Sequence, residues 1–428
     1  MRIASGQGAL GESPDLLVPA FGAHPDYVVC DSLAEATTSL LALDRSRDER
    51  LGYAPDLEAR LAIALPYVAG RCGRLITNAG GVNPVGAHQM AMACAREAGF
   101  RGLRVALVCA PMERPEGALG REVYLGAAGI VSALAQGADV VITGRVADAA
   151  LFLAPAVHEH GWSWADWDRL AAGAVVGHLL ECSNQVSGGN YSGDWWNTVD
   201  LLRVGMPVAE VDADGTAVIT KPEGTGGRVS FDTVREQLLY EVHDPAAYIT
   251  PDVVVDMTSV ELKEVGPDRV QVSGAKGRPR PTALKGLLFE RAGWAGEVAI
   301  TYAWPDAEAK GRHVLRSLRA VAEARKIPVV EWCEEYFGID GFGGPTVGAV
   351  ASDPPEVTAR LAWRTASANA AHDVARLVGL VALSGPPGLQ GIGRTRKGHP
   401  LSELVALTSF FIDRGDVEPR VHVHVEEV

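Results

Sequence analysis

Arg145 and Asp148 are the pair of residues in this sequence best suited to binding an acidic ligand. They follow a short apolar run, residues 139–143, that is typical of a buried strand, and Gly144 allows a sharp turn into a helix that begins near Ala147. Ligands bind at such strand ends in open α/β sheets. The planar guanidinium of Arg145 can hold a carboxylate or phosphate through two hydrogen bonds, and the first helical turn favours the negative charge of Asp148. A structural ion pair between them is the alternative.

Three carboxylates are candidates for exchanging a proton with a substrate: Glu35, Asp148 and Glu181. Glu35 lies in the first turn of the helix predicted after a strand at residues 27–30, and Glu181 lies at the end of another predicted helix. Carboxylates near a cation and amide groups are suited to moving the proton next to a carbonyl. A solvated carboxylate at a helix end is the alternative for Glu181.

A polar loop follows the strand predicted at residues 74–78. It contains Asn78, Gly80, Gly81 and Asn83, and a helix is expected directly after it, over residues 86–98. Exposed amides in a loop of this kind can cradle an anion or polarise a carbonyl oxygen. We therefore expect these four residues to bind substrate.

Other loops supply further candidates for substrate binding. Lys221 opens a glycine-rich segment, residues 221–227, whose amides and cation could receive a phosphate or carboxylate, although the Gly-Lys-Ser/Thr signature of a P-loop is absent. Trp195 and Trp196 lie near glycines, and we expect them to flank a pocket between two domains. The remaining candidates are Ser5, Asp31, Gln185, Gly188 and Gly189.

Nucleotide and metal sites are not favoured by the remaining motifs. Residues 6–11 read G-x-G-x-x-G after a predicted strand, but Pro19 and Gly22 interrupt the helix that a dinucleotide site requires, so a tight turn is the better interpretation. His422, His424 and Glu426 would share one face of a terminal strand, where an exposed polar face is the more common arrangement. We expect no cofactor and no metal.

The elements that must position these residues predict an α/β fold. Five strand-loop-helix repeats indicate a mostly parallel sheet with flanking helices, a Rossmann-like layer, whose functional loops meet at one edge. We expect this layer to form a domain over residues 1–200. A second, α+β domain over residues 201–428 should contain a β-rich segment, a β-α-β unit, a long helix over 355–383 and a terminal strand.

The composition limits the classes of function. With 428 residues, 47% of them apolar, the chain can bury a large core, and a net charge of −14 argues against nonspecific binding of nucleic acid. The cysteines are widely spaced without a Cys-x-x-Cys motif, which fits the reducing cytoplasm. No apolar run reaches the roughly 18 residues that a membrane span requires, so we expect no membrane contact.

Several segments together resemble the acyclic terpene utilisation AtuA family, and the resemblance spans nearly the whole chain. The matching segments are Ser-Leu-Ala-Glu-Ala-Thr (32–37), Asn-Ala-Gly-Gly-Val-Asn-Pro (78–84), Thr-Gly-Arg-Val-Ala-Asp (143–148), Gly-His-Leu-Leu-Glu-Cys (177–182) and Thr-Lys-Pro-Glu-Gly-Thr-Gly-Gly (220–227). The resemblance implies a setting in which isoprenoid and leucine-type branched acids are degraded as CoA thioesters. Ser32 departs from the family pattern, where a tyrosine is usual.

The residues and the resemblance together predict an enzyme. We expect a cofactor-independent hydratase or lyase that acts on a branched carboxylic acid or its CoA thioester, with Arg145 anchoring the carboxylate. An acyl-CoA thioesterase or amide hydrolase is one alternative, and a noncatalytic acyl-ligand-binding subunit of a larger complex is another. We also expect a homo-oligomer. Because many relatives continue into a ferredoxin-like module that is missing after residue 428 here, a separate small ferredoxin-like subunit is a further expected partner.

Overall fold

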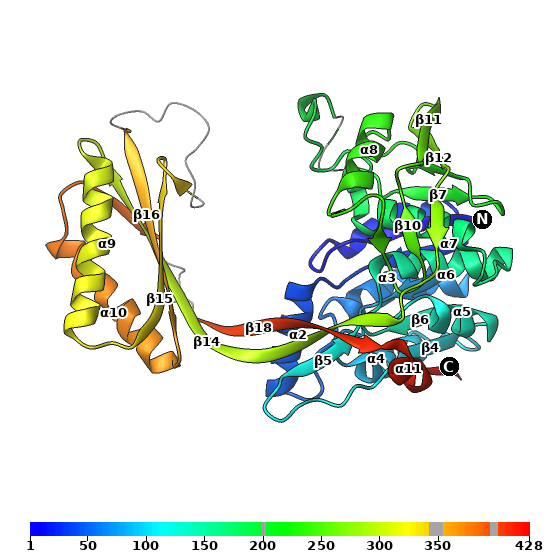
Figure 1. Ribbon diagram of the computed structural model, residues 1–428, viewed down its shortest axis with the longest axis horizontal. Helices are drawn as coiled ribbons and strands as arrows, with labels where there is room; N and C mark the ends of the chain where they lie inside the picture. Colours follow the sequence, from blue (N-terminus) through cyan, green and yellow to red (C-terminus); the bar gives the residue numbers. More distant parts are fainter. Residues whose placement is uncertain (199, 201–202, 342–353, 394–400) are drawn as a thin grey trace. The chain divides into compact units, whose positions relative to one another are not determined.

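The computed structural model describes residues 1–198, 200, 203–341, 354–393 and 401–428 (Figure 1). The chain divides into two compact units, Met1–Phe289 together with Leu407–Val428, and Glu290–Ala406. This division differs from the expected domains 1–200 and 201–428. The reason is that strands after residue 200 extend the sheet of the first unit and thereby belong to its core.

The first unit is built on a ten-stranded mixed sheet, counted over the described residues. Its central strands pair in parallel, in the spatial order β1 (Arg2–Gln7), β2 (Tyr27–Cys30), β3 (Arg74–Thr77), β6 (Val140–Thr143) and β4 (Arg104–Cys109). Antiparallel strands extend it on both sides: β7 (Val208–Val211), β8 (Ala217–Thr220), β12 (Arg269–Ser273) and β11 (Glu261–Gly266) beyond β1, and β19 (His422–Glu427) beyond β4.

The expected mostly parallel, Rossmann-like layer is therefore corrected to a mixed α/β sheet. Residues 208–273 return beside β1 as antiparallel strands, because short turns such as the one at Asp212–Thr216 join antiparallel neighbours without a crossover helix. The next parallel strands, β6 and β4, lie beyond β3, whereas in the Rossmann order the strand after the first three lies beside the first of them.

Helices cover both faces of this sheet. One face packs against α1 (Leu17–Gly22), α3 (Leu57–Ala69) and α4 (Pro84–Glu97), and the other against α5 (Ala128–Ala135), α6 (Asp148–His160) and α7 (Trp167–Glu181). Successive residues of one strand point to opposite faces, so Val28 joins the first core and Val29 the second. Helices α6 and α7 pack against each other within the second core (Figure 1).

The connections explain where polar side chains gather. Steps from β1 to β2, β3 and β4 move across the sheet in one direction, which places their helices on one face, whereas the step from β4 back to β6 places α5 on the opposite face. Helices that follow β3 and β6 thus leave the sheet on opposite sides. Such a switch between neighbouring strands is where ligands bind in open α/β sheets, beyond the carboxyl ends of the strands.

Smaller elements complete the first unit. They are α2 (Glu35–Arg47), β5 (Gly120–Val123), α8 (Phe231–Leu239), β9 (Tyr248–Ile249), β10 (Val254–Asp256), β13 (Lys276–Arg278) and α11 (Arg414–Val417). Two long strands, β14 (Ala283–Ala303) and β18 (Ser402–Asp413), pair with each other and contain residues of both units.

The second unit has a split β-α-β arrangement. Its elements follow the order β14, α9 (Ala307–Ala324), β15 (Val329–Phe337), β16 (Glu356–Thr365), α10 (Ala368–Ser384) and β17 (Leu389–Gly393). The strands lie in the order β15-β16-β14-β17 and are antiparallel, as in ferredoxin-like domains. A ferredoxin-like arrangement is thus present within this chain, and the separate subunit stays a prediction.

The prediction of one long helix over residues 355–383 is wrong for the first third of that range. Residues 356–365 form β16, in which Val357, Ala359, Leu361 and Trp363 are buried and alternate with less buried residues. That period of two suits a strand with one face on a core and cannot place these side chains on one stripe of a helix. Among the described residues, no helix is both long enough and apolar enough to cross a membrane.

Gly80 connects β3 to β6, and its replacement should destabilise the first unit. A Cβ atom at this position would lie 2.4 Å from the carbonyl oxygen of Thr143, the same atom that accepts a hydrogen bond from the Gly80 amide at 3.0 Å. We expect Gly80→Ala to lower the free energy of unfolding by about 1–3 kcal/mol in urea denaturation. Gly22→Ala in α1, where a Cβ would meet nothing within 4 Å, is the control and should not lower it.

Candidate functional site

Buried polar groups meet beyond the carboxyl ends of β1, β2 and β3. The Asn78 side chain donates to Asp31 Oδ1 at 2.6 Å and accepts from the Ser32 amide at 2.7 Å, while the Ser32 hydroxyl donates to Gln7 Oε1 at 2.8 Å. These side chains are all buried. Burial raises the pKa of Asp31 above its ordinary value, although the charge of Arg145 and the Asn78 hydrogen bond oppose the shift.

Arg145 lies at the next strand end, after β6, and is itself buried with 2% of its surface exposed. Its Nη2 lies 2.9 Å from Asp148 Oδ1, its Nη1 donates to the Leu33 carbonyl oxygen, and its guanidinium stacks over the Tyr124 ring at 4.4 Å. Only Nε lacks a partner among the described residues. The guanidinium therefore forms the structural ion pair, which was the alternative to ligand binding. It is not free to hold a ligand carboxylate through two hydrogen bonds.

Asp148 links this buried ion pair to solvent. Its Oδ1 is buried against Arg145, whereas the side chain as a whole is 36% exposed. The surrounding protein raises the pKa of Asp148, the nearby Asp31 carboxyl raises it further, and Arg145 acts in the opposite direction. Asp148 is thus the side of the ion pair that a small molecule can reach.

Glu35 also lies on the solvent side of this cluster. It accepts a hydrogen bond from the Tyr124 hydroxyl and lies 3.3 Å from Lys285 Nζ, and its side chain is 44% exposed. Partial burial opposes ionisation, but the Tyr124 hydrogen bond and the charges of Arg145 and Lys285 outweigh it and lower the pKa of Glu35 to about 2. Such a group stays ionised at neutral pH, which suits charge balance better than proton transfer.

Glu181 has the opposite character. It lies at the end of α7, where its Oε1 is 2.9 Å from His178 Nδ1, while Glu181 Oε2 and His178 Nε2 are buried without partners among the described residues. Burial raises the pKa of Glu181 to about 7, against the hydrogen bond and charge of His178. The His178 ring also lies 5.3 Å from the Tyr248 ring.

These carboxyl groups act on one another. The charge of each of three carboxyl groups raises the pKa of another. Glu181 raises the pKa of Asp31, Asp31 raises that of Asp148, and Asp148 raises that of Glu181. Arg145 is the cation that interacts with Asp31, Asp148 and Glu35. We call Asp31, Glu35, Arg145, Asp148 and Glu181 the acid cluster. Its carboxyls outnumber the guanidinium, so some of them hold protons near neutral pH.

The loop of Asn78 to Asn83 lies beside the cluster but serves a structural purpose. Its backbone amides donate within the protein: Gly80 N to Thr143 O, Gly81 N to Asn78 O and Asn83 N to Gly80 O. The Asn83 side chain caps α4 at the Gly86 amide and donates to backbone carbonyls of residues 49–51. Gly80, Gly81 and Asn83 therefore do not present the free amides that we had expected, and Asn78 contributes through its side chain alone.

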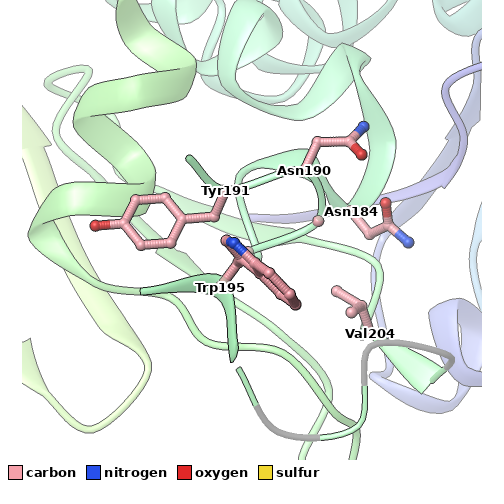
Figure 2. A pocket seen from close by; sticks show the side chains of 7 residues that line it. Asn184, Asn190, Tyr191, Trp195 and Val204 are labelled. Carbon is pink, nitrogen blue, oxygen red and sulfur yellow. The ribbon is translucent and has the colours of Figure 1, made fainter. Parts of the chain in front are cut away.

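A cavity of about 470 Å³ lies next to the end of α7 (Figure 2). It is lined by Asn184, Gly188, Gly189, Asn190, Tyr191, Trp195 and Val204, all from the first unit. Trp195 lines it as expected, whereas Trp196 is not among the lining residues and meets the Trp195 ring edge-on at 5.7 Å. The pocket is thus within one unit and not between two. Asn184 follows Glu181 by three residues in the chain, but none of the five residues of the acid cluster lines the cavity.

The remaining candidates are held by neighbours. The amides of Gly188 and Gly189 donate to Gln185 O and Asn184 O, each at 3.0 Å, and the Gln185 side chain donates to Gln237 at 2.9 Å. Lys221 lies 3.2 Å from Asp268 and donates to Thr225 O at 2.9 Å, within its own glycine-rich loop. The buried Ser5 hydroxyl donates to Gln7 O at 3.4 Å. Lys221 and Ser5 thus do not join the acid cluster.

The sequence reasoning missed three contributors: His178, Tyr124 and Lys285. His178 precedes Glu181 by three residues on a helix, a spacing that brings side chains together and could have revealed the pair. Tyr124 and Lys285 reach Glu35 from other parts of the chain, and no local pattern predicts those contacts. In the part of the chain that the structure describes, no group of three or more His, Cys, Asp or Glu residues is arranged to hold a metal ion.

The His178–Glu181 pair should make stability depend on pH. Although burial opposes it, the Glu181 hydrogen bond and charge raise the pKa of His178, and burial raises that of Glu181. The folded pair therefore keeps a proton at a pH where the unfolded chain has lost it, so stability falls as pH rises from about 4.5 to about 7, the ordinary and the raised pKa of Glu181, and falls further above 6.5 through His178. We expect Glu181→Gln to reduce this fall in urea denaturation over that range. An unchanged slope would show that the pair does not hold the proton.

A comparison with known families and proteins gave one match. The model of the family described as acyclic terpene utilisation family protein AtuA matches residues 1–423. No curated protein and no solved structure matches the chain.

Proposed function

The chain belongs to the acyclic terpene utilisation family AtuA, which indicates a role in isoprenoid metabolism, and from this premise we propose that it is a hydratase or lyase of that metabolism. Its substrate would be a branched or isoprenoid carboxylic acid or the CoA thioester of one. The observation that carries the proposal is Glu181, a buried carboxyl whose pKa is raised to about 7 and whose second oxygen has no partner among the described residues. A carboxyl of this kind can take and return a proton at neutral pH.

Adding or removing water beside a carbonyl requires a proton to move at the neighbouring carbon. In the proposal Glu181 Oε2 takes this proton, and the support is that His178 lies 2.9 Å from Oε1 and orients the carboxyl group. His178 also shares the proton, since its own pKa is raised by Glu181. Proton transfer by a positioned side chain is worth about 10²–10⁴-fold in rate.

The negative charge that develops on the substrate must also be stabilised. In the proposal Arg145 does this from within the protein, with its Nε as the remaining donor and Asp148 as the exposed group that fixes its orientation. A preorganised cation in a poorly solvated site stabilises charge more than it would in water. Glu35 stays ionised and balances Lys285 at the solvent side.

The cavity beside α7 would receive the part of the substrate that does not react. Its volume of about 470 Å³ and the exposed ring of Trp195 suit a small organic group, and the side chains of Asn184 and Asn190 offer hydrogen bonds (Figure 2). The chemistry as proposed uses only groups of the chain. The homo-oligomer, the small partner subunit and the cytoplasmic location remain predictions.

The test is to incubate the purified protein with a panel of branched enoyl and hydroxyacyl thioesters in D₂O. Addition or loss of water, seen by mass spectrometry, or exchange of the proton beside the carbonyl, seen by NMR, is the expected result. Release of free CoA without either change would favour the thioesterase alternative. Ligand binding without any turnover across the panel would contradict the proposed enzymatic activity and favour a noncatalytic acyl-ligand-binding subunit.

A further inference from the structure

We propose that the second unit carries a separate binding site for a small anionic metabolite, at a cavity formed by the two helices of its ferredoxin-like arrangement. The cavity has a volume of about 430 Å³ and is lined by Ala309, Lys310, His313, Ser384, Gly385 and Pro386. This volume falls within the range of about 300–1,000 Å³ that small-molecule sites occupy. The ligand would carry a carboxylate or a phosphate group.

Two nitrogen-bearing side chains come from one helix. Lys310 and His313 lie three residues apart in the first half of α9, so both side chains point to the same face of the helix. Both line the cavity. An ammonium group and an imidazole on one wall provide hydrogen-bond donors that phosphates and carboxylates accept.

A buried hydroxyl group without a partner lies beside Gly385, one of the lining residues. Tyr302 on β14 is fully buried, and its hydroxyl has no hydrogen-bond partner among the described residues. It lies 3.1 Å from the position that a Cβ atom would take at Gly385, which lines the cavity. A buried hydroxyl without a partner is destabilising, and in the proposal a bound oxyanion accepts its hydrogen bond.

Glycines keep this space open. Gly385 has an ordinary backbone conformation, so it is not needed for a turn, but a side chain there would press on Tyr302 and on the Val381 carbonyl oxygen at 2.7 Å. At Gly388 a Cβ atom would lie 3.3 Å from Lys310 Nζ. A side chain at Gly385 would therefore crowd the Tyr302 hydroxyl, whereas glycine at 388 is already favoured by its φ of 86°.

The alternative is that Lys310 only stabilises the nearby backbone. Its ammonium donates to the Ala303 carbonyl oxygen at 3.3 Å, which uses one of its three donors. The end of α10 at Ser384 contributes a partial negative charge of about −0.5, which disfavours an anion. Asp306 and Glu308 at the start of α9 are acidic, and Glu308 is paired with Arg312 at 2.8 Å, so in the proposal the ammonium group of Lys310 is what attracts the anion.

Calorimetric titration of the full chain tests the site. Inorganic phosphate and acetate are titrated separately at constant ionic strength, with chloride as the reference, so the two arms distinguish phosphate from carboxylate ligands. We expect saturable binding of one of them. Lys310→Gln should weaken it at least tenfold, which is about 1.4 kcal/mol. Arg325→Gln, an exposed cation at the other end of the same helix, is the matched control and should leave it unchanged.

Two results would overturn the proposal. One is the absence of saturable binding of either anion by the parent protein. The other is equal binding by the parent, Lys310→Gln and a second variant, His313→Gln, with unchanged thermal melting of all three. The outcome is independent of the acid cluster, because Glu181→Gln changes only the first unit and should retain the binding.

Discussion

Replacing Glu181 by Gln should lower turnover by about 10²–10⁴-fold while leaving substrate binding within a few-fold of the parent. Glutamine has the same shape, and its carbonyl oxygen can still accept the hydrogen bond from His178 Nδ1 that the structure shows at 2.9 Å. What the substitution removes is the proton that Glu181, with a pKa near 7, takes and returns. The rate of proton exchange beside the carbonyl, followed by NMR in D₂O, is the measurement.

The matched control is Glu97→Gln. Glu97 is exposed and is the last residue of α4, as Glu181 is the last residue of α7, so a general effect of losing a helix-end carboxylate would appear in both variants. Glu97→Gln should retain full activity. If Glu181→Gln retained it as well, Glu181 would not be the proton-transferring group, and Asp148, whose side chain is partly exposed and whose pKa is raised, would be the next to test.

Replacing Arg145 by Met should destabilise the first unit by about 3–5 kcal/mol. Arg145 is 2% exposed, and its removal leaves the buried Asp31 carboxyl and the buried oxygen of Asp148 without the cation that offsets them. The methionine side chain fills much of the space over the Tyr124 ring, so the loss reports charge more than volume. Chemical denaturation is the measurement.

Arg169→Met serves as the control for this substitution. Arg169 pairs with Asp166 at the same distance, 2.9 Å, and across the same three-residue spacing as Arg145 and Asp148, but its side chain is 45% exposed. Exposed pairs contribute about 0–1 kcal/mol because water solvates both partners. Equal losses for the two variants would mean that Arg145 is no more than an ordinary ion pair.

The stability that Arg145→Met loses should depend on pH, because the acid cluster contains several carboxyl groups. Removing Arg145 should also raise the pKa of Asp31 further, because the cation that lowers it is lost. Part of the loss of stability should therefore be recovered at low pH, where Asp31 becomes neutral. Denaturation of Arg145→Met at two pH values would show this recovery as a smaller difference from the parent in acid.

Local patterns in the sequence identified most parts of the parallel strands and the acids that follow them. Apolar runs rich in β-branched residues predicted strands that end near Cys30, Asn78 and Thr143, and residues following strands β2, β3 and β6 do meet at one edge. Parallel strands impose this meeting, since their carboxyl ends lie at the same edge. Asp31, Asn78 and Arg145 could for this reason be nominated together.

Contacts between segments that are far apart in the sequence could not be predicted from local patterns. The alanine-rich composition of residues 355–383 suggested one helix, but tertiary packing on α9 makes residues 356–365 a strand. The antiparallel strands beyond β1 were expected in another domain, because short β-rich segments carry no mark of the sheet they will join. Burial against a partner decides such cases more than local propensity does.

What the sequence determined by itself was the family, the strand ends and the types of residue placed there, because these depend on neighbours along the chain. Tertiary structure decided which of those groups can react. Both Arg145 and Glu181 are of a type that a site uses, yet folding pairs two nitrogens of Arg145 with Asp148 and Leu33, whereas Glu181 Oε2 has no partner among the described residues. The pKa of a charged group depends on whether the group is solvated, paired or buried without a partner. Segments that are distant in the sequence determine which of these holds.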